Sequence, residues 1–508
     1  VRRLAISNEE IFGQFKSLTD QNSIYQSNKE AVKGLGGDVG LKAYVMFNRA
    51  VAELLNKHSD AIKQKLDFVI GNDWMATSAM SQLQGAADKL KRIYFFHNHY
   101  DEARKTSLFE KMGLSLPESL KKQDKMSLSS LGLNNIDVLI ANQNYFNHVT
   151  QTGLAKGRPI VDALKQVATK VQDMHHGLLN TNDPRYAKGL REPGFTNLKD
   201  EALNEAEIKR YKAANKLAVQ KQVGLTPDPD STLFFWNSRF DPFQKGCDVV
   251  LEEAADFLKA NPKAQMLFYG LDANEATEAK LQKLQENPDL KGRIAVKVGK
   301  LSFETSIIQA YAGSDFYMMP SLYEPFGLTQ LEAMKLGSIP VVNDVDGIKT
   351  TTSDPDKNAG KKEAAWDYGK IAVKMNPFSI TDYLRSFNKL IKLENGDELS
   401  PTEKAVMKMT ENLKGGSELE KQLLEARKEL LSEKIKTDED DKNIKAAGSA
   451  FREALDRAMA LSQKPEELLK ARLNGMKYVD KEHTWGAIAK RYYVPMFKKL
   501  FPSLQESA

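Results

Sequence analysis

Short runs of β-branched and aromatic residues alternate with longer stretches of helical periodicity over the first part of the chain. The strands that these runs predict are residues 3–7, 66–70, 92–96 and 136–141, and residues 43–58 have the apolar spacing of an amphipathic helix. Strands that alternate with helices at this pace are typical of a parallel sheet with crossover helices. The pattern therefore predicts a first Rossmann-like domain over residues 1–195.

A polar stretch with many prolines and turn residues, 177–229, follows this series and contains one predicted helix, 198–223. The alternation then resumes. It predicts strands 232–236, 265–269, 294–298, 316–319 and 339–342, and helices 249–260 and 276–285. A second Rossmann-like domain is expected over residues 196–475.

Two segments depart from this alternation. Residues 394–445 are rich in Glu, Lys, Leu and Asp around a Gly-Gly pair, which predicts a helical hairpin inserted in the second domain. Such charged helices are usually solvated surface, and a partner-binding role stays open. The final segment, 476–508, places apolar residues at helical spacing around Pro495, which predicts an amphipathic helix with a kink.

Length and charge narrow the class of protein. The 508 residues exceed one ordinary core, and 73 basic against 68 acidic residues leave a net charge of +5, too balanced to favour nucleic acid as a partner. No apolar run has the roughly 20 residues of a membrane span, and the start lacks the pattern of a signal peptide. The single cysteine, Cys247, excludes a disulfide within the chain, so a cytoplasmic location is expected. The chain starts at Val1 and not at methionine, which suggests a fragment and leaves room for upstream domains.

The first chemical motif lies between a predicted strand and a predicted helix. Arg239 and Lys245 flank a turn that ends at Gly246. A turn that opens a helix presents free backbone N–H groups to an anion, and two cations beside it suit a diphosphate leaving group. The alternative interpretation is two ordinary basic residues on a surface loop.

The second motif follows the predicted strand 316–319. Its loop contains Glu324, Phe326 and Gly327, and a helix is expected from Leu328, with Glu332 one turn further in. The N–H groups of Gly327, Leu328 and Thr329 would face a phosphate, while the two carboxylates would accept hydrogen bonds from sugar and ribose hydroxyls. The alternative is a helix with one surface glutamate and one salt-bridged glutamate.

These two motifs together resemble the C-terminal domain of the GT-B glycosyltransferases. Arg-x5-Lys-Gly at 239–246 and Glu-Pro-Phe-Gly-Leu-Thr-Gln-Leu-Glu at 324–332 are most similar to bacterial glycogen and starch synthases. Asn-Asp-Trp at 72–74 and Phe-His-Asn at 96–98 are similar to two motifs of the same family. Pro-Ser-Leu-Tyr-Glu-Pro-Phe-Gly at 320–327 also resembles the related mannosyl- and sucrose-type transferases.

The resemblance implies a fold, a reaction and residue roles. The fold would be GT-B: two Rossmann-like domains that face each other across a cleft, with a C-terminal helix that crosses back to the first domain. The enzyme would move a hexose from an ADP-, UDP- or GDP-linked sugar to a hydroxyl acceptor with retention at the anomeric carbon, without a cofactor or a metal. The implied sites are Arg239 and Lys245 for the diphosphate; Glu324 and His97 for the donor sugar; Glu332 for the ribose; Phe326, Gly327, Leu328 and Thr329 around the nucleotide; and Asp73 on the acceptor side.

The sequence also departs from the family. The glycine-rich loop of the family is represented by Gly36 and Gly37 in a shorter, shifted form, and only about thirty residues separate it from the next predicted strand. The first domain, which shapes the acceptor site, is thus abbreviated. Three hypotheses stay open: a glycogen-synthase-like glucosyltransferase, a transferase that glycosylates a protein or small molecule with another hexose such as mannose, and an inactive nucleotide-sugar-binding module.

Overall fold

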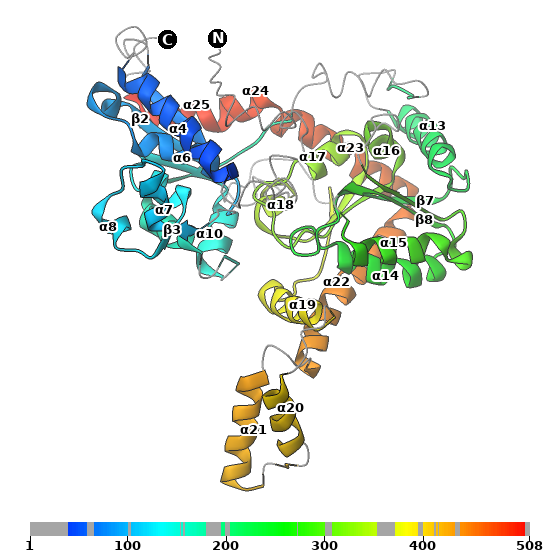
Figure 1. The fold of residues 1–508 in the computed structure, drawn as a ribbon. Coiled ribbons are helices and arrows are strands. Elements are labelled where there is room, and N and C mark those ends of the chain that lie inside the picture. Colours follow the sequence, from blue (N-terminus) through cyan, green and yellow to red (C-terminus); the bar gives the residue numbers. More distant parts are fainter. Residues whose placement is uncertain are drawn as a thin grey trace. The chain divides into compact units, whose positions relative to one another are not determined.

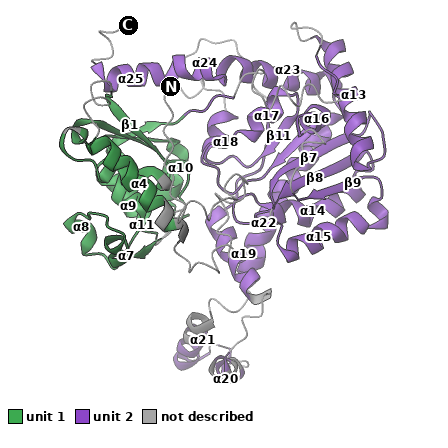
Figure 2. Cartoon of the chain, turned by 45° about the horizontal axis from the view of Figure 1, so that its top comes forward, with its two compact units in different colours: residues 1–174 green, residues 175–508 purple. Residues whose placement is uncertain are grey.

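The structure is a computed structural model of the chain. It describes residues 39–57, 66–99, 103–152, 154–155, 158–178, 195–198, 204–271, 273–299, 307–352, 371–394, 400–410, 413–414, 416–431 and 437–502. The strand predicted at 3–7 and the glycines Gly36 and Gly37 lie outside these residues. Figure 2 shows two compact units, Val1–Met174 and His175–Ala508, each of which is described here by itself.

Unit 1 is built on a four-stranded sheet of order β1-β2-β5-β6. Its strands are β1 (Phe68–Asn72), β2 (Lys91–Phe95), β5 (Val138–Ala141) and β6 (Val171–Asp173). All neighbouring pairs are parallel, as the alternation of strands and helices predicts. Every residue of β5 is buried because crossover helices cover both faces of a parallel sheet. A small antiparallel pair, β3 (Arg104–Lys105) and β4 (Lys125–Met126), lies outside this sheet, and the sequence pattern does not reveal it.

The helices described in unit 1 precede β1 or lie between the strands along the chain (Figure 1). They are α4 (Val39–Lys57), α6 (Trp74–Ser81), η2 (Gly85–Lys89), α7 (Thr106–Lys111), α8 (Glu118–Lys121), α9 (Leu128–Leu133), α10 (Gln143–Gln151), α11 (Pro159–Gln166) and η3 (Ala168–Lys170). Asn142 begins α10: its side-chain oxygen accepts a hydrogen bond from the N–H of Tyr145 at 3.1 Å. The first turn after β5 is fixed in this way.

Unit 2 contains a six-stranded parallel sheet of order β12-β11-β10-β7-β8-β9. Its strands are β7 (Thr232–Arg239), β8 (Ala264–Leu271), β9 (Ile294–Val298), β10 (Phe316–Met319), β11 (Ile339–Val342) and β12 (Val373–Lys374). From β7 the chain runs outward through β8 and β9, and it then returns to the other side of β7 with β10. The strand order therefore reverses between β7 and β10.

Helices of unit 2 cover both faces of this sheet, whereas α20 and α21 lie away from it (Figure 1). The helices described in unit 2 are α13 (Glu205–Val223), α14 (Cys247–Ala260), α15 (Glu275–Glu286), η4 (Pro288–Leu290), α16 (Ile307–Gly313), α17 (Thr329–Lys335), α18 (Asp346–Thr351), α19 (Ile380–Glu394), α20 (Pro401–Thr410), α21 (Glu418–Leu431), α22 (Asp438–Ser462), α23 (Pro465–Glu482), α24 (Trp485–Ile488), the π-helical turn η5 (Ala489–Tyr493) and α25 (Val494–Leu500). The predicted helix 198–223 begins only at Glu205, because the side chain of Asn204 accepts from the N–H of Glu207 and caps it there.

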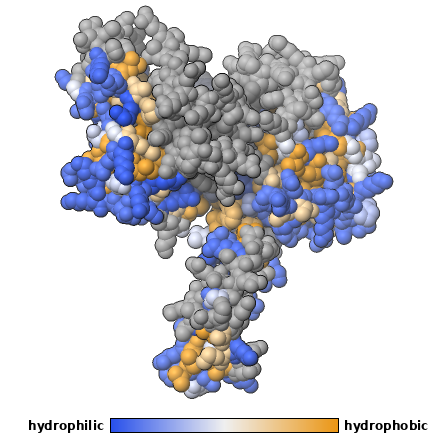
Figure 3. Space-filling model, in the orientation of Figure 1, coloured by the Kyte–Doolittle hydropathy of each residue, from blue (hydrophilic) through white to orange (hydrophobic). Residues whose placement is uncertain are grey.

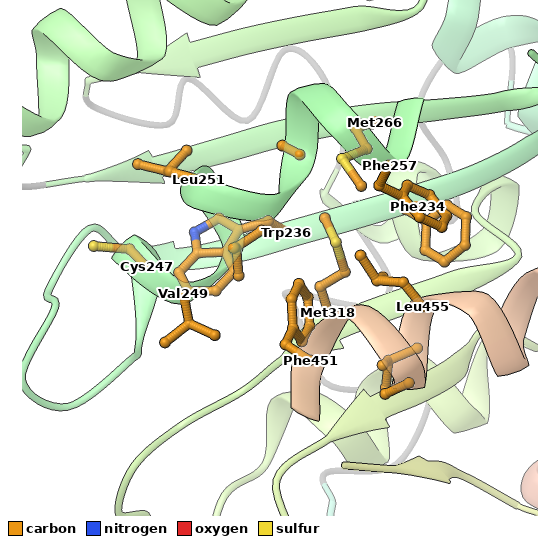
Figure 4. Close-up of a cluster of buried hydrophobic side chains, with 14 of the residues drawn as sticks. Phe234, Trp236, Cys247, Val249, Leu251, Phe257, Met266, Met318, Phe451 and Leu455 are labelled. Carbon is orange, nitrogen blue, oxygen red and sulfur yellow. The ribbon is translucent and has the colours of Figure 1, made fainter. Parts of the chain in front are cut away.

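Alternate residues of β7 enter two different hydrophobic clusters. Phe234 and Trp236 point into one cluster, whereas Leu233 and Phe235 point into the other. Figure 4 shows the first cluster, in which Phe451 of α22 lies beside Met318 of β10. A continuous apolar run in the sequence thus marks a strand that is buried on both faces.

A buried charge cluster joins α13, the start of β10 and α23. The carboxylate of Asp315, 4% exposed, lies 2.6 Å from the Lys216 ammonium and also contacts the guanidinium of Arg472. It accepts a further hydrogen bond from the backbone N–H of Leu233 at 2.8 Å. Lys212, on the next turn of α13, donates to the carbonyl of Ser314. These contacts fix two helices, distant in sequence, against the edge of the same strand.

The last segment of the chain belongs to unit 2 and ends in a broken helix. The predicted kink at Pro495 takes the form of η5 followed by α25, because proline has no N–H to continue the helical hydrogen bonds. His175 stacks on Tyr492 at 3.5 Å between ring centroids, and Leu178 forms an isolated β-bridge with Thr484. These contacts lie within unit 2, which begins at His175. The domain bounds expected from the sequence stay a prediction.

The predicted insertion 394–445 contains α20 and α21, which pack against each other, and the first residues of α22. Met409 and Leu419 of this helical pair are 77% and 66% exposed. Figure 3 shows hydrophobic and hydrophilic residues side by side on its surface. Among the described helices, none is both long enough and apolar enough to span a bilayer.

Candidate active site

The turn after β7 carries the first chemical motif. Arg239 is the last residue of β7, and Gly246 precedes α14 with a left-handed backbone, φ 66°. A Cβ atom on Gly246 would lie 2.6 Å from the carbonyl oxygen of Pro320, so only glycine fits there. The turn therefore approaches the loop after β10 closely.

The side chain of Asp241 shapes this turn. Its Oδ1 accepts hydrogen bonds from the N–H groups of Phe243 at 2.9 Å and of Gln244 at 3.1 Å. Its Oδ2 lies 3.4 Å from the guanidinium of Arg239, which also donates to Gln244. The Arg239 side chain is 42% exposed, so it is held in place yet can reach a ligand.

The second motif meets the first at a salt bridge. Lys245 Nζ lies 2.6 Å from Glu324 Oε2, and the two side chains are only 15% and 11% exposed. The motifs come together because β7 and β10 are parallel neighbours and both turns leave the same edge of the sheet. An ammonium group has three donors, so Lys245 keeps protons for a second partner. The structure thus unites Lys245 and Glu324, which the sequence places 79 positions apart.

The backbone of Glu324 is held from both sides by a segment that the sequence analysis did not identify. Its N–H donates to Asp346 Oδ2 at 2.9 Å, and its carbonyl accepts from the N–H of Gly347 at 3.0 Å. Asp346 has φ 43°, in the left-handed region. Both residues follow β11, the next strand beyond β10, and no local sequence signal relates them to Glu324.

Replacing Gly347 by alanine is expected to destabilise the fold by about 1–3 kcal/mol, the range for overpacking. Its Cβ would lie 2.1 Å from Cα of Phe326, and a backbone neighbour cannot turn aside. Chemical denaturation measures the loss. Gly486→Ala is the matched control, because nothing lies within 4 Å of a Cβ there. Equal stability of the two variants would contradict this packing.

The loop before α17 depends on a buried glutamine. Gln330, fully buried, donates from Nε2 to the carbonyl of Gly327 at 2.9 Å and to the hydroxyl of Thr351 at 2.7 Å. Gly327 has φ 78° and would crowd this amide if it had a Cβ. Thr329 begins α17, with Leu328 as the capping residue and Glu332 in the first turn. The predicted start of this helix, Leu328, thus differs by one residue from the observed start, Thr329.

Aromatic residues flank the same loop. Phe326 is 4% exposed and packs edge-on against His176 at 5.0 Å between ring centroids. Burial raises the pKa of Tyr311 and Tyr317, and the negative charge of Glu332 raises both further. Glu332 is therefore within electrostatic reach of the two phenols, whose hydroxyls hydrogen-bond to Asn237. No local pattern in the sequence singles out His176.

In unit 1 the predicted site residues lie at the carboxyl ends of β1 and β2. Asp73 precedes α6 with φ 58°, and its Oδ1 accepts from the N–H of Asn98 at 3.2 Å. His97 Nε2 lies 3.1 Å from Asn72 Oδ1, and burial lowers the pKa of His97. The imidazole is therefore neutral at neutral pH, and it can exchange hydrogen bonds with uncharged hydroxyls.

Two family models match the chain. "Starch synthase catalytic domain" matches residues 1–156, and "Glycosyl transferases group 1" matches residues 220–361. The catalytic domain of starch synthase IV from Arabidopsis thaliana, bound to ADP and acarbose, superposes with a TM-score of 0.59 at 17% identity over 90% of this chain and 76% of that chain. The chain has the GT-B fold. The fold expected from the sequence is confirmed.

The curated proteins that this chain resembles include several glycogen synthases. Those of Exiguobacterium sibiricum, Clostridium perfringens and Lactococcus lactis are 26%, 37% and 27% identical over 71%, 29% and 62% of this chain. The matches cover 70%, 29% and 64% of the relatives' own lengths. The resemblance to glycogen and starch synthases is thus confirmed, and so is assignment as a hexosyltransferase.

Proposed function

We propose that this enzyme transfers glucose from a nucleoside diphosphate glucose to a hydroxyl group of an α-glucan, with retention at the anomeric carbon. The observation that carries the proposal is the Lys245–Glu324 pair at the carboxyl edge of β7 and β10. Open α/β sheets bind ligands outside the carboxyl ends of their strands, where the strand order reverses. The two motifs that resemble the glycogen synthases lie at that point of the sheet.

Arg239 and Lys245 would bind the diphosphate. As the bond between the sugar and the diphosphate breaks, negative charge grows on the leaving oxygen, and two fixed cations stabilise it. Glu324 would accept hydrogen bonds from sugar hydroxyls, and its contact with Lys245 would keep both side chains in place. Glu332 would accept from the ribose, with Phe326 and the backbone of Gly327, Leu328 and Thr329 around the nucleotide.

The residues of unit 1 would complete the reaction site. His97 would contact the donor sugar, Asp73 would lie on the acceptor side, and Gly36 and Gly37 would approach the phosphate. The C-terminal segment 476–508 would cross back to the first domain, as the resemblance implies. Two closing domains would exclude water and so suppress hydrolysis of the donor. We place this reaction in the cytoplasm, where the buried thiol of Cys247 stays reduced.

The test combines donor and acceptor. ADP-, UDP- and GDP-glucose are compared by thermal shift, since a ligand at about a hundred times its Kd stabilises a fold by about 2.7 kcal/mol. We expect ADP-glucose to give the largest shift, because the starch synthase that shares this fold carries ADP. Lengthening of a malto-oligosaccharide by one hexose, seen by mass spectrometry, checks the acceptor. If a nucleotide sugar stabilises the protein but its hexose is transferred to no acceptor, the transferase hypotheses are excluded. The hypothesis of an inactive nucleotide-sugar-binding module then remains.

The helical pair α20–α21 favours a second candidate acceptor. Its exposed apolar side chains, Met409 and Leu419, offer a surface on which a protein substrate could dock. Transfer of a hexose to a protein or small molecule, and not to the oligosaccharide, would support this candidate. UDP- or GDP-linked mannose is then the donor to compare.

Glu332→Ala is expected to weaken the affinity for the donor while kcat changes little. The carboxylate lies on the first turn of α17, one turn away from Leu328, and would contact the ribose and not the reacting bond. Loss of a hydrogen bond to a charged group costs about 1.5–3 kcal/mol, or roughly ten- to a hundredfold in Kd. Calorimetric titration of nucleoside diphosphate measures it. An unchanged Kd would dismiss the ribose role.

A further inference from the structure

Unit 1 contains an open pocket, and neither of the predicted site residues Asp73 and His97 is among its described lining residues. Its volume is about 500 Å³, within the 300–1,000 Å³ of small-molecule sites. Strand β4, the last turn of α10 and the first turns of α11 form its walls. The apolar side chains of Val149 and Val161, both buried, belong to its lining. The proposed transferase reaction uses none of these residues.

The lining is basic. Lys125, Arg158 and Lys165 bring three positive charges, and Asp162 is the one carboxylate among the lining residues that the structure describes. Lys125 and Lys165 are exposed, and within the described part of the chain neither has a carboxylate oxygen within 4.0 Å. These two exposed lysines, without a described carboxylate within 4.0 Å, create a positive potential on the concave surface, which concentrates anions there.

Neutral hydrogen-bonding groups stand beside these charges. The amide side chains of Gln123 and Gln151 and the hydroxyl of Thr150 also line the pocket. Thr150 donates its proton to the carbonyl of Phe146 at 2.7 Å, so its oxygen remains an acceptor for a ligand hydroxyl. The described residues of the lining include no aromatic ring on which an uncharged sugar would stack. A ligand here needs negative charge and hydroxyl groups together.

Arg158, in the lining of the pocket, also interacts electrostatically with the buried side chain of His99. Burial, then the charges of Arg158 and His148, lower the pKa of His99 to about 3. The ring of His99 lies 2.6 Å from the hydroxyl of Tyr145, on α10. His99 follows His97 by two residues, so the positive wall of the pocket is close to the turn after β2.

We propose that this pocket is a binding site for a phosphate monoester of a small sugar. Lys125, Arg158 and Lys165 hold the phosphate, and the two glutamines and Thr150 contact the hydroxyl groups. The described lining of the pocket belongs to unit 1, whereas Arg239 and Lys245 belong to unit 2, and the inference does not depend on the proposed function.

The test is calorimetric titration of the full chain with a hexose monophosphate, with the diphosphate site blocked by the Arg239→Ala substitution. We expect binding that weakens as salt is added. The double variant Lys125→Ala/Lys165→Ala should raise Kd about tenfold or more, since two cations at contact distance are lost. The charge-matched control Lys89→Ala/Lys111→Ala removes two exposed lysines of the same unit that do not line the pocket, and it should leave Kd unchanged.

Titrations with inorganic phosphate and with the unphosphorylated hexose distinguish the contribution of the phosphate group to binding from that of the sugar. We expect inorganic phosphate to bind more weakly than the hexose monophosphate. This result would show that the site contacts both the phosphate and the hydroxyl groups of the sugar. The unphosphorylated hexose should not bind. Equal affinity for hexose and hexose monophosphate, equal affinity for inorganic phosphate and the monoester, no binding, or equal Kd values for the two double variants would each overturn the proposal. Melting curves confirm that all variants are folded.

Discussion

Arg239→Ala and Lys245→Ala are each expected to lower kcat by about 10²-fold or more. This is the range for removing one preorganised group that stabilises a developing anion. Arg239 is 42% exposed, and its side-chain hydrogen bonds to described residues lie within its own turn, so its removal should affect catalysis with little loss of stability. Steady-state kinetics with saturating donor and acceptor measure the effect.

Lys245 needs a separate control because it is paired with a buried carboxylate. Lys245→Ala leaves Glu324, 11% exposed, without its cation, which by itself destabilises the fold. The double variant Lys245→Ala/Glu324→Gln removes that uncompensated charge, and it should recover stability but not activity. Lys259→Ala, at a lysine 48% exposed on the far end of α14, should keep wild-type kcat. Wild-type turnover by Arg239→Ala and Lys245→Ala would show that the diphosphate site is misassigned.

Asp315→Ala is expected to cost about 3–5 kcal/mol of unfolding free energy, the second large effect. It leaves Lys216 and Arg472 buried and uncompensated, and breaking a buried ion pair from one side has a cost of this size. The N–H of Leu233 also loses its acceptor. Urea denaturation followed by tryptophan fluorescence measures the change. Asp289→Ala, at an aspartate whose side chain is 68% exposed, should stay within about 0.5 kcal/mol of wild type.

The same cluster predicts the sign of a pH dependence. Burial alone would raise the pKa of Asp315, but the charges of Lys216, Arg472 and Lys212 outweigh it and hold the pKa below its ordinary value. A carboxylate with a lowered pKa stabilises the fold fully above its unfolded pKa of about 3.9, and this stabilisation is lost as the pH falls through the folded value. Wild type should therefore lose more stability on acidification than Asp315→Ala. An identical pH dependence of the two proteins would contradict the ionised cluster.

Local patterns in the sequence determined most of the fold of each unit. The runs at 232–236 and 316–319 predict β7 and β10 because strands buried on both faces are continuously apolar. The short strands β6 and β12 were not predicted, since two or three residues are too few for a period. The sequence predicts that helix α13 starts at residue 198, whereas it starts at Glu205. The prediction is too early because the helical periodicity of the sequence continues on the N-terminal side of the capping residue Asn204.

The sequence by itself determined which side chains could carry the chemistry: Arg239 and Lys245 in one strand-to-helix turn, and Glu324 and Glu332 around another. Each of these motifs is a local arrangement, set by glycines and strand ends. Only the tertiary structure decided that Lys245 and Glu324 form a salt bridge, and that Asp346 and Gly347 hold the Glu324 backbone. The physical reason is that strand order in a parallel sheet depends on the packing of both faces, which no single segment specifies.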